Sequence, residues 1–146
     1  MNKSLLLAWI AAVIATIGSL YFSEVMHFIP CTLCWYQRIL MYPLAIILGI
    51  SVYKNDKGIY QYVLPLSIIG MLISGYHVML EKIPYFQQFE MCTTGVPCSK
   101  DYINWLGFIT IPMLAFIAFS IITISLVILA RSYKEETVNN PVNPIP

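Results

Sequence analysis

Four long stretches without a charged side chain dominate the pattern of hydrophobic and polar positions along the chain. They cover residues 4–23, 39–53, 58–80 and 102–130. A helix that crosses a bilayer needs about 20 mostly apolar residues. Three stretches have this length, and the second reaches it if its helix begins near Cys34, with Arg38 close to the interface. The pattern therefore predicts an all-α membrane protein, an antiparallel bundle of four transmembrane helices.

These stretches define one integral membrane domain over residues 1–146. We expect its spans at about residues 5–23, 35–53, 59–80 and 103–130. Small residues recur four positions apart, as at Ala8 and Ala12 and at Gly70 and Ser74, and this spacing lets helices approach closely in lipid. The tail, about residues 132–146, contains three prolines and three asparagines, and we expect it to be disordered.

Composition narrows the class of protein. Hydrophobic residues make up 59% of the chain and charged residues only 10%, whereas a soluble domain of this size needs a more polar surface. The net charge of +1 provides no basic surface for nucleic acid. We therefore expect the lipid bilayer, and no nucleic acid, among the partners of this chain.

The placement of lysine and arginine indicates the orientation of the bundle. With four spans, both termini and the middle loop share one side, which holds five of these residues, against three on the other side. Positive residues are enriched on the cytoplasmic side of a membrane. The bias predicts cytoplasmic termini and two extracytoplasmic loops, the first and the third.

All four cysteines fall in those two loops. Cys31 and Cys34 precede the second span, and Cys92 and Cys98 precede the fourth. Disulfides persist in an oxidising extracytoplasmic space. The pairs 31–34 and 92–98 are the economical assignment, although four cysteines allow three connectivities.

Three interpretations of the cysteines compete. Two disulfides could simply stiffen the loops. A zinc site of four cysteines would need reduced thiols and a closer spacing than the five residues between Cys92 and Cys98, so we expect no metal. Redox catalysis suits a C-x-x-C pair at a helix start, where the thiol pKa is lowered and the small ring opens and closes readily.

Two ionisable residues lie near the first cysteine pair. Arg38 is four residues beyond Cys34, on the same helix face, and its charge would favour a Cys34 thiolate in the first helical turn. Its alternative role is that of an interfacial anchor. His77 lies at a similar depth in the third span, where an ionisable residue is a functional candidate, although a histidine hydrogen-bonded between helices explains it equally well.

The motif Pro30-Cys31-Thr32-Leu33-Cys34, followed by Gln37-Arg38, resembles the signature of the DsbB family of disulfide-bond formation proteins. The small size and compact second cysteine pair are most similar to its short BdbC-type members. The resemblance covers the whole bundle and implies a bacterial cytoplasmic-membrane enzyme. Such enzymes reoxidise a DsbA-like, thioredoxin-fold oxidase and pass the electrons to membrane quinone, ubiquinone or menaquinone.

The resemblance also implies a role for each site residue. Cys31 and Cys34 would be the quinone-side pair, Cys34 being the thiolate beside the ring, and Arg38 and, less directly, His77 would bind the quinone. The partner would attack Cys92, and Cys98 would then attack Cys31. This chain differs from the family pattern in the pair formed by Cys92 and Cys98, because better-known members separate these two cysteines by a much longer loop. The shorter loop gives Cys98 less freedom to reach Cys31.

Two alternatives remain. A vitamin K epoxide reductase-like, quinone-linked oxidase is also a four-helix bundle, but its C-x-x-C lies near the end of the last helix, whereas here it comes first. A disulfide-stiffened membrane scaffold would show reduction potentials below about −300 mV, with catalytic disulfides higher.

Overall fold

The computed structural model describes residues 2–27, 31–89 and 110–140, and most of these residues are helical. The long helices are α1 (Lys3–Leu20), α2 (Thr32–Lys54), α3 (Tyr60–Lys82) and α4 (Ile111–Asn139). A π-helical turn, η1 (Tyr21–Val25), continues α1, and two 3₁₀ segments, η2 (Lys57–Ile59) and η3 (Pro84–Phe89), flank α3. All four long helices are long and apolar enough to cross a membrane. The predicted fold class is confirmed.

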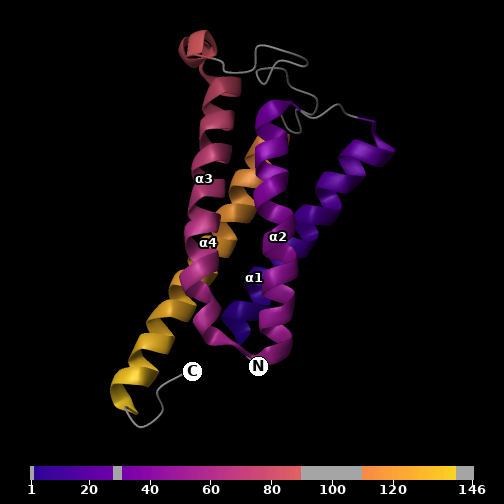
Figure 1. The fold of residues 1–146 in the computed structure, drawn as a ribbon. Coiled ribbons are helices and arrows are strands. Elements are labelled where there is room, and N and C mark those ends of the chain that lie inside the picture. The colour runs from indigo at the N-terminus through magenta and orange to yellow at the C-terminus, as the bar shows by residue number, and fades with distance from the viewer. Residues whose placement is uncertain (1, 28–30, 90–109, 141–146) are drawn as a thin grey trace.

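The helices pack in a ring, α1 against α2, α2 against α3, α3 against α4, and α4 against α1. A short turn joins α2 to α3, in which Asn55 adopts a left-handed conformation (φ 53°) and the Asp56 side chain accepts a hydrogen bond from the Gly58 N–H. This turn lies at the same end of the bundle as the start of α1 (Figure 1). The start of α2 and the end of α3 therefore meet at the opposite end.

Small residues bring the helices together, as the spacing predicted. Ala8 and Ala12 of α1 have no exposed surface. Gly70 of α3 faces the fully buried ring of Phe119 on α4 so closely that a methyl group at position 70 would overlap that ring. Large aliphatic side chains such as Ile46 and Leu72 point outward, 65% and 64% exposed. An apolar exterior is what a bilayer requires.

The expectation of a disordered tail from residue 132 is wrong for residues 132–139, which continue α4. Contacts with the α2–α3 connection explain the continuation. The rings of Tyr133 and Tyr60 lie 5.7 Å apart, and the Lys57 ammonium lies 2.7 Å from the Glu136 carboxylate. Composition alone does not reveal these partners, which lie more than 70 positions away in the sequence.

Candidate functional site: a thiol pair beside a membrane cavity

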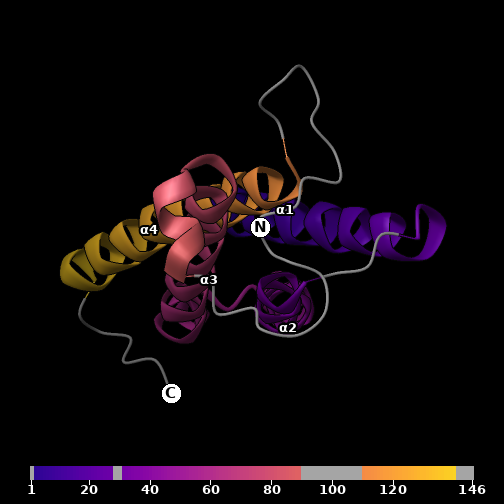
Figure 2. The same ribbon diagram turned by 90° about the horizontal axis from the view of Figure 1, so that it is seen from above.

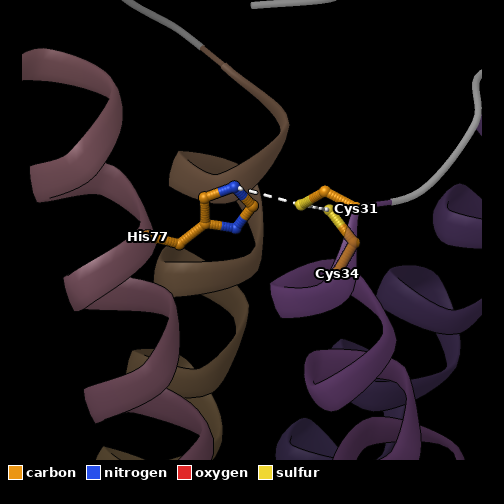
Figure 3. Close-up of side chains that lie close together, drawn as sticks. All are labelled: Cys31, Cys34 and His77. Atoms are coloured by element: carbon orange, nitrogen blue, oxygen red, sulfur yellow. Dashed lines mark hydrogen bonds between the residues drawn. The ribbon is translucent and has the colours of Figure 1, made fainter. Parts of the chain in front are cut away.

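Cys31 and Cys34 form a thiol pair at the start of α2. Cys31 is the extended residue that caps the helix, and its carbonyl accepts the first helical hydrogen bond, from the Trp35 N–H at 3.1 Å. Cys34 lies in the first turn, so the two sulfur atoms point to the same side and lie 3.4 Å apart (Figure 3). This first turn has backbone N–H groups without helical partners, which favour negative charge on a nearby sulfur.

His77 reaches the pair from α3. Its Nε2 lies 3.6 Å from Cys31 Sγ (Figure 3), and its Nδ1 lies 3.1 Å from Gln37 Nε2. Only 2% of the His77 surface is exposed. The histidine is thus hydrogen-bonded between helices, as one of the two interpretations expects, and it also touches the cysteine pair.

The surroundings favour negative charge on Cys31, which lies just before the span that begins at Thr32. A hydrogen bond with Cys34 is the main cause that holds the pKa of the Cys31 thiol below its usual range. Burial acts against this shift, and the contact with His77 adds to it.

Arg38 is held by the end of α1 as well as by its own helix. Its Nε donates to Ser19 Oγ at 3.0 Å, its Nη2 donates to the Ser19 carbonyl at 3.1 Å, and its Nη1 donates to Ser23 Oγ at 3.4 Å. The guanidinium carbon also lies 5.7 Å from the centre of the Trp35 ring. These contacts position the positive charge beside the cavity that Cys34 also lines.

The cavity has a volume of about 490 Å³ and lies between α1, α2 and α4, with the end of α3 contributing to its lining. At its polar end it is lined by Cys31, Cys34, Arg38 and His77. Away from these residues its walls are mostly aliphatic and aromatic. Along α1 the lining extends from Ser19 back to Leu7, which is about 18 Å of helix at 1.5 Å per residue. Its size is typical of small-molecule sites.

The structure brings together four of the six predicted site residues, namely Cys31, Cys34, Arg38 and His77. Cys92 and Cys98 lie outside the described residues. Sequence reasoning missed Gln37, which was quoted in the motif without a role, and Ser19, to which it assigned no role in the site. It also missed Glu81, which lines the cavity one turn beyond His77; its position four residues after a candidate histidine was the available signal.

Comparisons with known proteins agree on one family. The family model "Disulfide bond formation protein DsbB" matches residues 2–129. "Disulfide bond formation protein C" of Bacillus subtilis is 56% identical over 88% of this chain and 93% of its own length. "Probable disulfide formation protein" of Coxiella burnetii is 42% identical over 94% of this chain and 95% of its own length. No solved structure matches the chain.

The fold and these similarities define a multi-pass membrane oxidoreductase that acts on thiols and disulfides. The chain belongs to the DsbB family of disulfide bond formation proteins. The cluster of two sulfurs and one imidazole nitrogen, all within 4.8 Å of one another, is also of a kind that soft metals accept. Since the family forms disulfides, we interpret Cys31 and Cys34 as a redox pair.

Proposed function

We propose that this protein reoxidises an extracytoplasmic DsbA-like partner and passes the electrons to a membrane quinone. One observation carries the proposal, which is that the Cys31–Cys34 pair opens into an apolar cavity at membrane depth. A structural disulfide in a loop needs no such cavity. An electron acceptor dissolved in the bilayer could reach the sulfurs through it.

The residues around the cavity fit a quinone. Arg38 places a cation at the polar end, where a reduced oxygen would carry negative charge, and the aliphatic walls along α1 suit an isoprenoid tail. A bound quinone would supply an acceptor for two electrons and two protons. Both ring nitrogens of His77 already contact protein atoms, so we propose that His77 influences the quinone through Cys31.

The thiol chemistry proposed for this chain has four exchanges. The partner's thiolate attacks Cys92, which forms a mixed disulfide and releases Cys98 as a thiolate. Cys98 then attacks Cys31, which opens the bond to Cys34 and leaves Cys34 as the thiolate beside the cavity. The partner's second thiol next attacks the partner's bond to Cys92, which releases the partner as a disulfide and Cys92 as a thiolate. Cys92 attacks Cys98, which restores the loop disulfide and frees Cys31. Each exchange forms one sulfur–sulfur bond and breaks another. Reclosing the Cys31–Cys34 bond then removes two electrons and two protons from the reduced pair.

We also propose that the protein resides in the bacterial cytoplasmic membrane with both termini in the cytoplasm. The excess of lysine and arginine on the terminal side supports this orientation. It exposes the cysteine-bearing end of the bundle to an exported partner.

Purified protein in detergent tests the proposal. A reduced thioredoxin-fold oxidase and a soluble ubiquinone or menaquinone analogue are added, and partner oxidation and quinone reduction are followed together. We expect one quinone reduced for each partner disulfide formed, and no quinone reduction and no more than a single turnover of partner oxidation by Cys34→Ser or Cys31→Ser. Partner oxidation that proceeds equally well without any quinone would overturn the assignment of the acceptor.

A further inference from the structure

The amide of Gln37 lies buried between α2 and α3 and makes a specific contact. Only 6% of its surface is exposed, and its Nε2 lies 3.1 Å from His77 Nδ1. A buried amide is costly unless it is hydrogen-bonded. Gln37 lies on α2 three residues beyond Cys34, so the same helix presents the thiol pair and the group that holds the histidine.

This contact determines which histidine nitrogen carries the proton. A neutral imidazole has one N–H donor and one acceptor nitrogen. Since the Gln37 amide donates to Nδ1, the ring proton must lie on Nε2. That nitrogen lies 3.6 Å from Cys31 Sγ, within reach of a hydrogen bond to sulfur. The imidazole N–H is therefore directed at Cys31.

We propose that Gln37 is a positioning residue, which fixes His77 in the Nε2–H tautomer so that His77 donates a hydrogen bond to the Cys31 thiolate. The proposal rests on the proposed function only in taking Cys31 and Cys34 as the reactive pair. When the reduced pair loses one proton to the medium, the charge settles on Cys31, which the N–H of His77 and the S–H of Cys34 then stabilise. The second proton leaves Cys34 when the pair is oxidised.

The depressed pKa of the Cys31 thiol agrees with this arrangement. Other groups also face the pair and would influence its titration. They are Arg38 and Tyr42 on α2 and Tyr76 and Glu81 on α3, while the described cavity walls on α1 and α4 contain no ionisable side chain. A test must therefore separate the effect that Gln37 exerts on the Cys31 thiol through His77 from the effects of these other groups.

Nitrogen NMR of the histidine ring tests the tautomer directly. The chain has two histidines, His27 and His77, so a His27→Gln variant assigns the signals. In ¹⁵N-histidine-labelled protein, with Cys92→Ser and Cys98→Ser removing the loop thiols, the reduced state should show protonated Nε2 and unprotonated Nδ1 for His77. Gln37→Met should give a mixture of tautomers. The opposite tautomer in the parent protein would overturn the proposal even if Gln37→Met failed to fold.

The pH dependence of Cys31 alkylation tests the consequence. In the same loop-thiol-free protein, mass spectrometry of peptides measures the rate at Cys31 over a range of pH. One hydrogen bond to the charged thiolate corresponds to about 1 to 2 pKa units. Gln37→Met should therefore raise the midpoint by about that amount, and His77→Leu should raise it at least as much.

A double variant and a matched control complete the experiment. Adding Gln37→Met to His77→Leu should cause no further shift, because Gln37 acts through the histidine. Leu44→Met is an equally buried change on α2, away from the cavity, and should leave the midpoint unchanged. If Gln37→Met still raises the pH midpoint of Cys31 alkylation when His77 is leucine, Gln37 does not act through His77 and the proposal is refuted. Neither readout uses quinone or partner, so a failure of the proposed function would be recognised separately.

Discussion

Arg38 and Ser19 join α2 to the end of α1 through two hydrogen bonds, one to the serine hydroxyl at 3.0 Å and one to its carbonyl at 3.1 Å. Tyr42 donates to the same hydroxyl at 3.4 Å. The position of the cation beside the cavity thus depends on a serine nineteen positions earlier in the sequence. Since α1 also forms one wall of the cavity, the same contact ties the charge to that wall.

Ser19→Ala should weaken quinone binding without removing the charge. The hydroxyl accepts from Arg38 and Tyr42, and a hydrogen bond contributes about 0.5–1.5 kcal/mol. We expect the KM for quinone to rise about threefold to tenfold, with a smaller change in kcat. Ser51→Ala is the control, because the Ser51 hydroxyl bonds only the Ile47 carbonyl of its own helix among the contacts found. Equal KM values for Ser19→Ala and the parent would show that Ser19 does not position Arg38.

Arg38→Met should impair the quinone step more strongly than Ser19→Ala. Hydrogen bonds to charged groups contribute about 1.5–3 kcal/mol, which corresponds to about 10-fold to 100-fold in kcat/KM. Arg38→Lys should recover part of the activity, because the charge remains while the planar fork is lost. Turnover at several quinone concentrations measures the effect, and the rate at which the reduced partner forms a mixed disulfide should stay normal. If neither quantity changes in Arg38→Met, the arginine is only an interfacial anchor.

Gly70→Ala should destabilise the bundle. The added methyl would overlap the Phe119 ring, which is fully buried and cannot move aside freely. Overpacking of this kind costs about 1–3 kcal/mol, against a gain of about 1 kcal/mol in helix propensity. We expect a lower thermal midpoint in detergent, partly restored by adding Phe119→Leu. Gly18→Ala, where a methyl meets no atom within 4 Å, should keep or raise the midpoint. Equal midpoints for Gly70→Ala and Gly18→Ala would contradict the close packing.

The sequence predicted the helices well because their pattern is local. Long uncharged runs have few structural solutions in a membrane, and the small residues at Ala8, Ala12 and Gly70 indicated close packing in advance. The meeting of His77 with the first cysteine pair also followed from topology. A span that ends near His77 and one that begins near Cys34 must meet at the same end of the bundle.

What the sequence did not reveal depends on side-chain direction and on distant partners. The helical spacing predicts Arg38 on the same helix face as Cys34, but nothing local shows that its guanidinium turns toward Ser19. Gln37 was part of the sequence motif but had no assigned role, and only the structure shows its amide against the His77 ring. The helical segment after residue 131 likewise depends on Lys57 and Tyr60, which a scan of local composition does not connect with it.

The proposed orientation predicts which cysteines a membrane-impermeant maleimide labels in intact, reduced cells. A chain with Cys98 as its single cysteine should be labelled directly. A chain whose four native cysteines are replaced by serine and that bears Glu135→Cys, on the exposed end of α4, should be labelled only after the membrane is opened. The reverse pattern would place the termini outside the cytoplasm.

Cys92 and Cys98 should have different roles in the thiol–disulfide exchange with the partner. If Cys92 is the sulfur that exchanges with the partner, its free thiol in Cys98→Ser should attack the disulfide of the oxidised partner, and a mixed disulfide should accumulate because Cys98 is not there to displace the partner. Cys92→Ser should form no stable complex, because the sulfur that joins the partner is absent. Non-reducing electrophoresis after mixing with the oxidised partner measures both results.

Cys31→Ser separates this first exchange from the second. Its Cys92–Cys98 bond should still be opened by the partner, and the resulting Cys98 thiolate would find no disulfide at position 31 to attack. We therefore expect a single turnover of partner oxidation by Cys31→Ser, against none by Cys92→Ser. A trapped complex in Cys92→Ser but not in Cys98→Ser would reverse the two roles. Multiple turnovers by Cys31→Ser would show that electrons leave the loop pair without passing through the pair at the cavity.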